Sequence, residues 1–178
     1  VADIATYMQQ TGRPAPSGDT GDYCRARAKL DLGVLRDLTG QAARQLDEQA
    51  PESWLWHGHQ AKLVDGFTFT MLDTPDNQRA FPQAKTQKPG IGLPLARACV
   101  VISLATATIH DLAVGPYAGK QTGETALLRE ILPALGKGDV VVFDRYFCSF
   151  MMLAMLKLQG VDACTRLHQF REIGRAHV

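Results

Sequence analysis

Two aspartates are the residues of this sequence best placed to do chemistry. Asp65 lies inside the stretch 61–72, whose alternating apolar residues predict a β-strand. Asp144 directly follows the short run 139–143, which is typical of a strand buried on both faces. No nucleophilic Ser or Cys constellation accompanies them, and paired carboxylates suit Mg²⁺. Two such ions about 4 Å apart would activate a water or a 3′-hydroxyl against a phosphodiester, so the pair predicts phosphoryl transfer on nucleic acid.

The setting of each aspartate sharpens this expectation. Strand periodicity puts Asp65 among apolar neighbours such as Leu63 and Phe67, where an unpaired charge is costly, so we expect a cation nearby. The alternative for Asp65 is a strand-end residue that caps a turn with Gly66. Asp144 follows the carboxyl end of a strand, where the functional groups of α/β sheets collect.

A stretch of one-sided charge is the second feature. Between Asn77 and His110 the sequence has no Asp or Glu, and residues 73–94 predict a long loop rich in Pro and Gly. A cationic loop that leaves the strand of Asp65 could hold a polyanion against it, and a solvated loop is the alternative. The candidates for contact with nucleic acid are Arg79, Lys85, Lys88, Arg97 and Arg145. For Arg145, pairing with a neighbouring carboxylate is the alternative.

The remaining motifs carry no assigned chemistry. The pair His57-x-His59 has no third ligand nearby, so exposed turn histidines are the simpler interpretation. Trp54 and Trp56 are most simply core or interface anchors. No dinucleotide-binding fingerprint or P-loop is present. The cysteines are too dispersed for a zinc site and predict reduced thiols of a cytoplasmic protein: Cys24, Cys99, Cys148 and Cys164.

Composition bounds the class of protein. The chain has 178 residues, of which 46% are hydrophobic and 21% charged, as in globular proteins. Its formal net charge of +1 leaves any electrostatic argument to the local basic stretch. The longest apolar runs fall far short of the roughly 18 residues of a membrane span, so no membrane partner is expected.

The order of the predicted elements defines an α/β fold class. Two helices are expected early in the chain, at 22–30 and from Asp31 to Pro51. The second helix has one apolar face, formed by Leu35, Leu38, Ala42 and Leu46. Strands at 61–72, 95–107 and 109–116 could form an antiparallel meander. A helix from Thr122, a strand at 139–143, a helix capped by Ser149 and a strand at 161–168 follow. The helix from Thr122 has an apolar side made of Leu127, Leu128, Ile131, Leu132 and Leu135.

Several short motifs together resemble a known family. They are Leu63-Val64-Asp65-Gly66, Asp73-Thr74-Pro75-Asp76-Asn77, Phe81-Pro82, Leu95-Ala96-Arg97, Gly123-Glu124-Thr125-Ala126-Leu127-Leu128, and Gly138-Asp139 with Asp144-Arg145-Tyr146-Phe147. In this order, across about residues 20–171, they are similar to the DDE transposases of the insertion sequence 4 family.

That resemblance implies a fold and an activity. It implies an RNase H-like mixed sheet in which Asp65 and Asp144 are the first two acids of a catalytic triad and ligate two Mg²⁺ ions, with Mn²⁺ as an alternative. It implies cleavage and joining of transposon-end DNA, with terminal inverted repeats and target DNA as partners and a homodimer in the synaptic complex. It also implies a bacterial cytoplasmic protein associated with the nucleoid.

The third acid of the family, a Glu in a Tyr-Arg-Glu-Lys pattern, has no counterpart in the sequence. The closing residues 172–178 resemble a translated sequencing adapter, so we expect a C-terminally truncated fragment, inactive for lack of that acid. We expect an N-terminal helical segment at 1–57 that could end a DNA-binding region, a partial RNase H-like core at 58–171, and a non-native tail at 172–178. The rival interpretations are a DNA-binding remnant without catalysis and an RNase H-like metal-dependent nuclease.

Overall fold

The computed structural model describes residues 2–13, 21–120 and 122–167 of the chain. The chain divides into two compact units, Val1–Leu35 and Arg36–Val178, so the division falls inside a helix and before the predicted boundary at residue 57. The predicted tail at 172–178, and His168 at the end of the last predicted strand, lie outside the described residues.

The first unit is helical where it is described. It contains α1 (Ala2–Gln10), α2 (Gly21–Ala28) and the beginning of α3 (Leu32–Glu48). Asp31 caps α3 as predicted, because its Oδ1 accepts hydrogen bonds from the backbone N of Gly33 at 2.7 Å and of Val34 at 3.2 Å.

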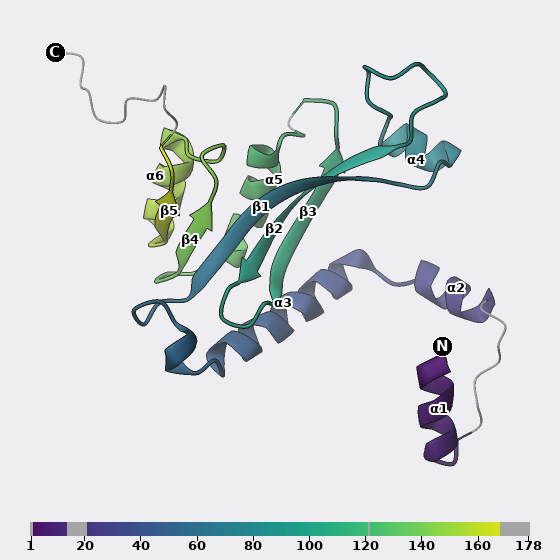
Figure 1. Ribbon diagram of the computed structural model, residues 1–178, viewed down its shortest axis with the longest axis horizontal. Coiled ribbons are helices and arrows are strands. Elements are labelled where there is room, and N and C mark those ends of the chain that lie inside the picture. Colours follow the sequence, from purple (N-terminus) through teal and green to yellow (C-terminus); the bar gives the residue numbers. More distant parts are fainter. Residues whose placement is uncertain (1, 14–20, 121, 168–178) are drawn as a thin grey trace. The chain divides into compact units, whose positions relative to one another are not determined.

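A five-stranded mixed sheet organises the second unit (Figure 1). Its strands are β1 (Ala61–Thr70), β2 (Leu95–Ser103), β3 (Ile109–Pro116), β4 (Val140–Phe143) and β5 (Asp162–Thr165). Their order is β3-β2-β1-β4-β5; the first three form the predicted antiparallel meander, while β4 runs parallel to β1 and β5 parallel to β4. This order and these directions are those of an RNase H-like fold, as predicted.

The main core lies between the sheet and two helices, α5 (Glu124–Ile131) and α6 (Phe150–Gln159). Figure 1 shows α5 crossing behind the meander. The predicted apolar side of α5 and of the 3₁₀ turn that follows it (Leu132–Ala134) is confirmed, since every member is buried: Leu127, Leu128, Ile131, Leu132 and Leu135. They share one cluster with Val64, Val141 and Phe143 of the central strands.

The ends of α6 follow from its sequence. Ser149 Oγ accepts a hydrogen bond from the backbone N of Met152 at 3.2 Å, which confirms it as the N-cap. Gly160 ends the helix in the left-handed conformation with φ of 72°, which glycine adopts without steric cost. These two signals fix the helix so that β5 starts directly after it.

The predicted apolar face of α3 does not pack against the sheet. Leu35, Leu38 and Leu46 are 41%, 57% and 48% exposed, and Ala42 is exposed as well. The buried side of the helix is instead Gly40, Ala43 and Asp47. Small residues allow the close approach: a Cβ on Gly40 would lie 3.1 Å from the carbonyl oxygen of His110 in β3. Steric fit therefore decided which side of α3 meets the sheet.

Smaller corrections concern the connections. The predicted loop at 73–94 contains a short helix, α4 (Pro75–Ala80), capped by Thr74, whose Oγ1 accepts a hydrogen bond from Asn77 N at 3.2 Å. β2 ends at Ser103 and β5 at Thr165, both earlier than predicted. A 3₁₀ turn (Glu52–Trp54) follows Pro51. No helix within residues 2–13, 21–120 and 122–167 combines the length and hydropathy of a transmembrane span.

No disulfide joins the four cysteines, all of which lie within the described residues. Cys99 and Cys148 are buried, whereas Cys24 and Cys164 are exposed. Burial raises the pKa of the Cys99 thiol to about 12, and the nearby carboxylates of Glu124 and Asp65 add to the shift. Cys99 is therefore a protonated core residue.

Candidate active site

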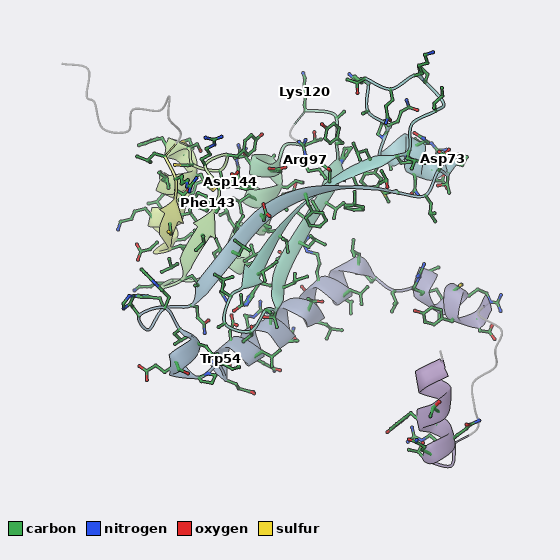
Figure 2. All side chains as sticks on the ribbon, in the orientation of Figure 1. Trp54, Asp73, Arg97, Lys120, Phe143 and Asp144 are labelled. Atoms are coloured by element: carbon green, nitrogen blue, oxygen red, sulfur yellow. The ribbon has the colours of Figure 1, made fainter. Side chains whose placement is uncertain are left out.

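Asp65 and Asp144 are brought together at the centre of the sheet. β1 and β4 pair in parallel, with Leu63 opposite Val142 and Val64 opposite Phe143. Asp65 follows Val64 and Asp144 follows Phe143, so both aspartates come directly after the last pair of this register. Both line one pocket of about 580 Å³ on the second unit. Figure 2 shows Asp144 directly after Phe143 at the carboxyl end of β4.

Both carboxylates are exposed, and each makes a local hydrogen bond. The Asp65 carboxylate accepts a hydrogen bond from the backbone N of Gly66 at 2.8 Å, and that of Asp144 from Tyr146 N at 2.6 Å. The expectation that Asp65 is enclosed by apolar side chains is wrong, since its neighbour Phe67 is itself 47% exposed. The alternative of a strand-end turn is wrong too, because β1 continues to Thr70.

Two arginine residues line the same pocket. Arg145 and Arg166 line it together with the two aspartates, and both are exposed. Among the described residues neither Asp65 nor Asp144 forms an ion pair within 4.0 Å, so no side-chain cation pairs directly with Asp65. The pocket thus combines opposite charges that are not neutralised by direct contact.

The amino end of α5 closes on β1 beside this pocket. A Cβ on Gly66 would lie 2.5 Å from Cδ of Glu124, so any larger residue would require that side chain to move. Glu124 Oε1 lies 3.9 Å from Nε of Arg97, and the Arg97 guanidinium sits 4.7 Å from the ring centroid of Tyr117. Glu124 is a residue that sequence reasoning missed as a neighbour of Asp65, although it lies in a motif of the resemblance.

The carboxylates fit one part of a magnesium site. Mg²⁺ is commonly held by one or two carboxylates together with waters and phosphate oxygens, and Asp65 and Asp144 supply that many. Within the part of the chain that the structure describes, no group of three or more His, Cys, Asp or Glu residues is placed to hold a metal ion. The residues present therefore suit an open site that shares its ion with a phosphate.

The five predicted nucleic-acid contacts lie in different surroundings. Arg145 lines the pocket of the two aspartates. Lys85 and Lys88 are exposed on the loop that follows α4, and Arg79 is exposed on α4 itself, 3.1 Å from Asp76. Arg97 is different, because its side chain is only 20% exposed and donates a hydrogen bond to the Thr122 carbonyl at 3.4 Å.

A buried polar network lies at the other end of β1, and sequence reasoning missed it. Asp47 of α3, Lys62 of β1 and His110 of β3 are 6%, 3% and 5% exposed. The Asp47 carboxylate pairs with Lys62 Nζ and lies 2.7 Å from His110 Nε2, and it accepts a hydrogen bond from Thr106 Oγ1 at 2.7 Å. The only sequence signal was a lysine inside an apolar strand.

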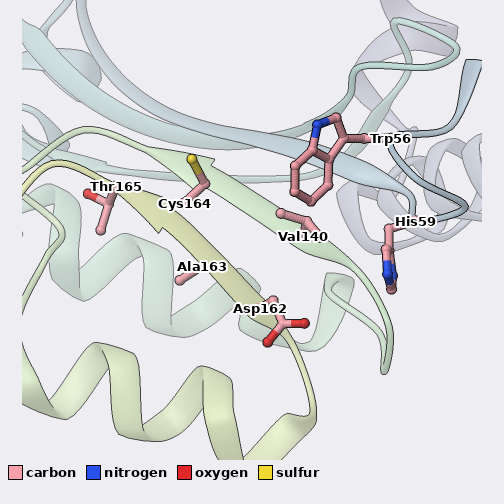
Figure 3. A pocket seen from close by; sticks show the side chains of 7 residues that line it. All are labelled: Trp56, His59, Val140, Asp162, Ala163, Cys164 and Thr165. Carbon is pink, nitrogen blue, oxygen red and sulfur yellow. The ribbon is translucent and has the colours of Figure 1, made fainter.

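A second pocket, of about 500 Å³, lies against β4 and β5. Figure 3 shows Trp56 on the same side of β4 as Val140 and Cys164, with His59 at the rim. Trp54 and Trp56 are 59% and 56% exposed, so neither is a core residue, and the alternative of an interface anchor stays a prediction. His57 and His59 are exposed turn residues as predicted, and His59 Nδ1 lies 3.0 Å from the Gly138 carbonyl.

Comparison with known proteins gives two likenesses. No protein-family model matches the sequence. The chain is 26% identical over 155 residues to a protein of Escherichia coli (strain K12) described as "Putative transposase InsZ", a match that covers 77% of this chain and 51% of that protein. The chain thus spans about half the length of the curated relative it matches. A solved structure, "Mos1 transposase paired-end complex with left transposon end", aligns with 91% of this chain and 49% of its own at 12% identity, with a TM-score of 0.40, too low to support an argument.

Proposed function

We propose that this chain is the RNase H-like part of a DNA transposase of the DDE type, resembling the insertion sequence 4 family. The observation that carries the proposal is the placement of Asp65 and Asp144 in one pocket on neighbouring parallel strands. The similarity to a protein described as a transposase supports the same class. Cleavage and joining of transposon-end DNA is the reaction that this class and these two carboxylates share.

In this proposal the aspartates of the pocket bind metal and its arginines bind phosphate. Asp65 and Asp144 would hold Mg²⁺ through carboxylates that are exposed and free of ion pairs among the described residues. The bound ions would supply an activated water or 3′-hydroxyl and stabilise the leaving oxygen. Arg145 and Arg166 would hold the phosphate through charge-assisted hydrogen bonds, because they line the same pocket.

Duplex DNA would be held mainly outside that pocket. Lys85 and Lys88 are exposed and stand in a stretch without acids, so they are suited to phosphate contacts. Arg79 would join them once released from Asp76 at the surface. Arg97 would contribute less, because it is mostly buried against Tyr117 and Glu124. Terminal inverted repeats and target DNA are the proposed ligands, bound by a homodimer in a synaptic complex.

The chain as given should not cleave or join DNA. Two divalent ions bring four positive charges against one phosphodiester, and two carboxylates balance only half of them. The third acid of the family's pattern is absent from the sequence, and no third carboxylate completes a metal site among the described residues. We therefore propose that the reading frame of the gene continues past Arg171 to a Tyr-Arg-Glu-Lys pattern.

The test compares four proteins in one assay. The 178-residue chain, a version extended from the native locus, and the extended version with Asp65→Asn or Asp144→Asn are incubated with Mg²⁺ and labelled transposon-end DNA. Only the unaltered extended version should nick the DNA and transfer the strand. Equal activity from the short chain would show that the two aspartates suffice. Equal activity from the Asn variants would show that the chemistry lies elsewhere.

A metal-binding measurement tests the site without turnover. Mn²⁺ broadens the NMR signals of residues close to it, so the short chain should lose the amide signals of Gly66 and Tyr146 first. The Asp65→Asn/Asp144→Asn double variant should keep them at the same Mn²⁺ concentration. Broadening that the double variant does not change would place the ion outside this pocket.

One rival function has an observation in its favour. A DNA-binding remnant without catalysis agrees with the lack of a complete three-carboxylate site in the described part of the chain. In that case the extended version would bind transposon ends and leave them intact. The other rival, a nuclease, would cut DNA without preference for those ends.

A further inference from the structure

The loop after α4 is built around one side chain, that of Gln83. Its Nε2 donates to the carbonyls of Lys88 at 2.8 Å and of Gln87 at 3.3 Å. Its Oε1 accepts from the backbone N of Gly90 at 3.1 Å and of Gly92 at 3.2 Å. The amide group thus uses both donors and both acceptor positions on backbone groups of the same loop.

The rest of the loop is consistent with one preformed shape. Gly90 has φ of 78°, a conformation that favours glycine. A Cβ on Gly92 would lie 2.0 Å from Oε1 of Gln87 and 2.9 Å from Cβ of Gln83, so a side chain at this position would require both glutamines to shift. Gln78 Nε2 donates hydrogen bonds to the Gly92 carbonyl at 2.9 Å and to the Asp73 carboxylate at 2.8 Å. These bonds connect the end of the loop to the segment that follows β1. Figure 1 shows the loop projecting beside α4 beyond the end of β1.

The loop also has the charge of a site for polyanions. Lys85 and Lys88 are exposed on it, and Lys85 lines a hollow of about 400 Å³ together with Gln83 and Gly90. No acidic residue occurs between Asn77 and His110. A flexible loop with these charges would lose conformational entropy on binding, whereas a preformed loop loses that entropy on folding, before it binds.

We propose that Gln83 is the positioning residue of this loop: it preforms residues 81–94 so that Lys85 and Lys88 meet the phosphate backbone of duplex DNA without further ordering. This inference rests on the proposed function as a DNA-binding protein. Gln83 itself need not touch the DNA, since its amide group is fully used inside the loop.

Preorganisation and charge leave different signatures in a salt titration. Each phosphate contact makes the slope of log K against log salt more negative by about 0.9, whereas loop ordering changes the affinity equally at every salt concentration. We therefore expect Gln83→Met to weaken binding about tenfold with an unchanged slope. Lys85→Ala/Lys88→Ala should make the slope less negative by about two.

The experiment uses the full chain and a fluorescein-labelled 30-base-pair duplex, followed by anisotropy between about 50 and 200 mM NaCl. Gln87→Met is the matched control: it makes the same change in the same loop, where the side chain forms no hydrogen bond with the described residues. Trypsin cleavage after Lys85 reports loop opening and should be faster in Gln83→Met only.

The outcomes separate this inference from the function on which it rests. Wild-type affinity in Gln83→Met, or an unchanged cleavage rate after Lys85, would overturn the role of Gln83 while leaving loop binding intact. An unchanged salt slope in the double lysine variant, or no binding by the unaltered chain, would overturn both the proposed loop contacts and this inference.

Discussion

Removing the cation of the buried network should destabilise the protein strongly. Lys62→Met keeps the length of the side chain and leaves the Asp47 carboxylate buried beside His110 without its ionic partner. Breaking a buried ion pair from one side costs about 3–5 kcal/mol of unfolding free energy. A domain of this kind has only about 5–15 kcal/mol in total, so the loss is a large fraction.

The network also predicts the response to acid. Although burial alone would raise the pKa of Asp47, hydrogen bonds from Lys62, Ser103 and Thr106 outweigh it and lower this pKa from 3.8 to about 2. By linkage this contributes about 2 kcal/mol of stability that is present above pH 4 and is lost between about pH 4 and pH 2.

His110 acts in the same direction at higher pH. Burial, helped by the charge of Lys62, lowers its pKa below 6.5 despite the attraction of Asp47. His110 therefore binds a proton more readily in the unfolded chain than in the folded chain, so the free energy of unfolding falls as the pH drops below 6.5. Stability should decline in two stages on acidification, first through His110 and then through Asp47.

Urea unfolding at pH 7, at pH 5 and at about pH 3 measures these effects. Lys157→Met, the same change at an exposed lysine, should shift the unfolding free energy by less than about 0.5 kcal/mol. The double variant Asp47→Leu/Lys62→Met should recover part of the loss, because it leaves no unpaired charge. A cost below about 1 kcal/mol for Lys62→Met at pH 7 would refute the buried-pair reasoning.

Two further substitutions test packing and capping by thermal melts. Gly66→Ala should cost about 1–3 kcal/mol because its Cβ collides with Glu124, and Glu124→Ala in the same chain should restore most of the loss; no recovery would assign the cost to the strand backbone. Ser149→Ala should cost about 1 kcal/mol by removing the cap of α6, and a neutral result would mean that packing alone holds this helix.

Structural elements that depend on a short local pattern of residues were predictable from the sequence. The alternation in 61–70 gave β1, the leucines after Gly123 gave the buried side of α5, and Ser149 with Gly160 gave both ends of α6. The two aspartates were identified because each stands on or directly after a strand of recognisable pattern. The short helix α4 was not predicted, although Thr74 followed by Pro75 is a helix-start signal.

Features that depend on distant partners were not predictable. Asp47, Lys62 and His110 come from α3, β1 and β3, and no spacing in the sequence links them. Leu38 and Leu46 belong to the apolar face that periodicity predicts for α3, yet the sheet contacts the side with Gly40, where a backbone carbonyl lies too close for a large side chain. Periodicity identifies an apolar face, but it does not say whether that face meets the sheet.

The two exposed cysteines are sites for spin labels that the unaltered sequence already contains. Cys24 is exposed on α2 in the first unit and Cys164 is exposed on β5 in the second, while Cys99 and Cys148 are shielded in the core. Nitroxide reagents should therefore label one position in each unit of the unaltered chain. Dipolar spectroscopy on the doubly labelled protein would then follow the separation of the two units, with and without DNA, and no cysteine would need to be added or removed.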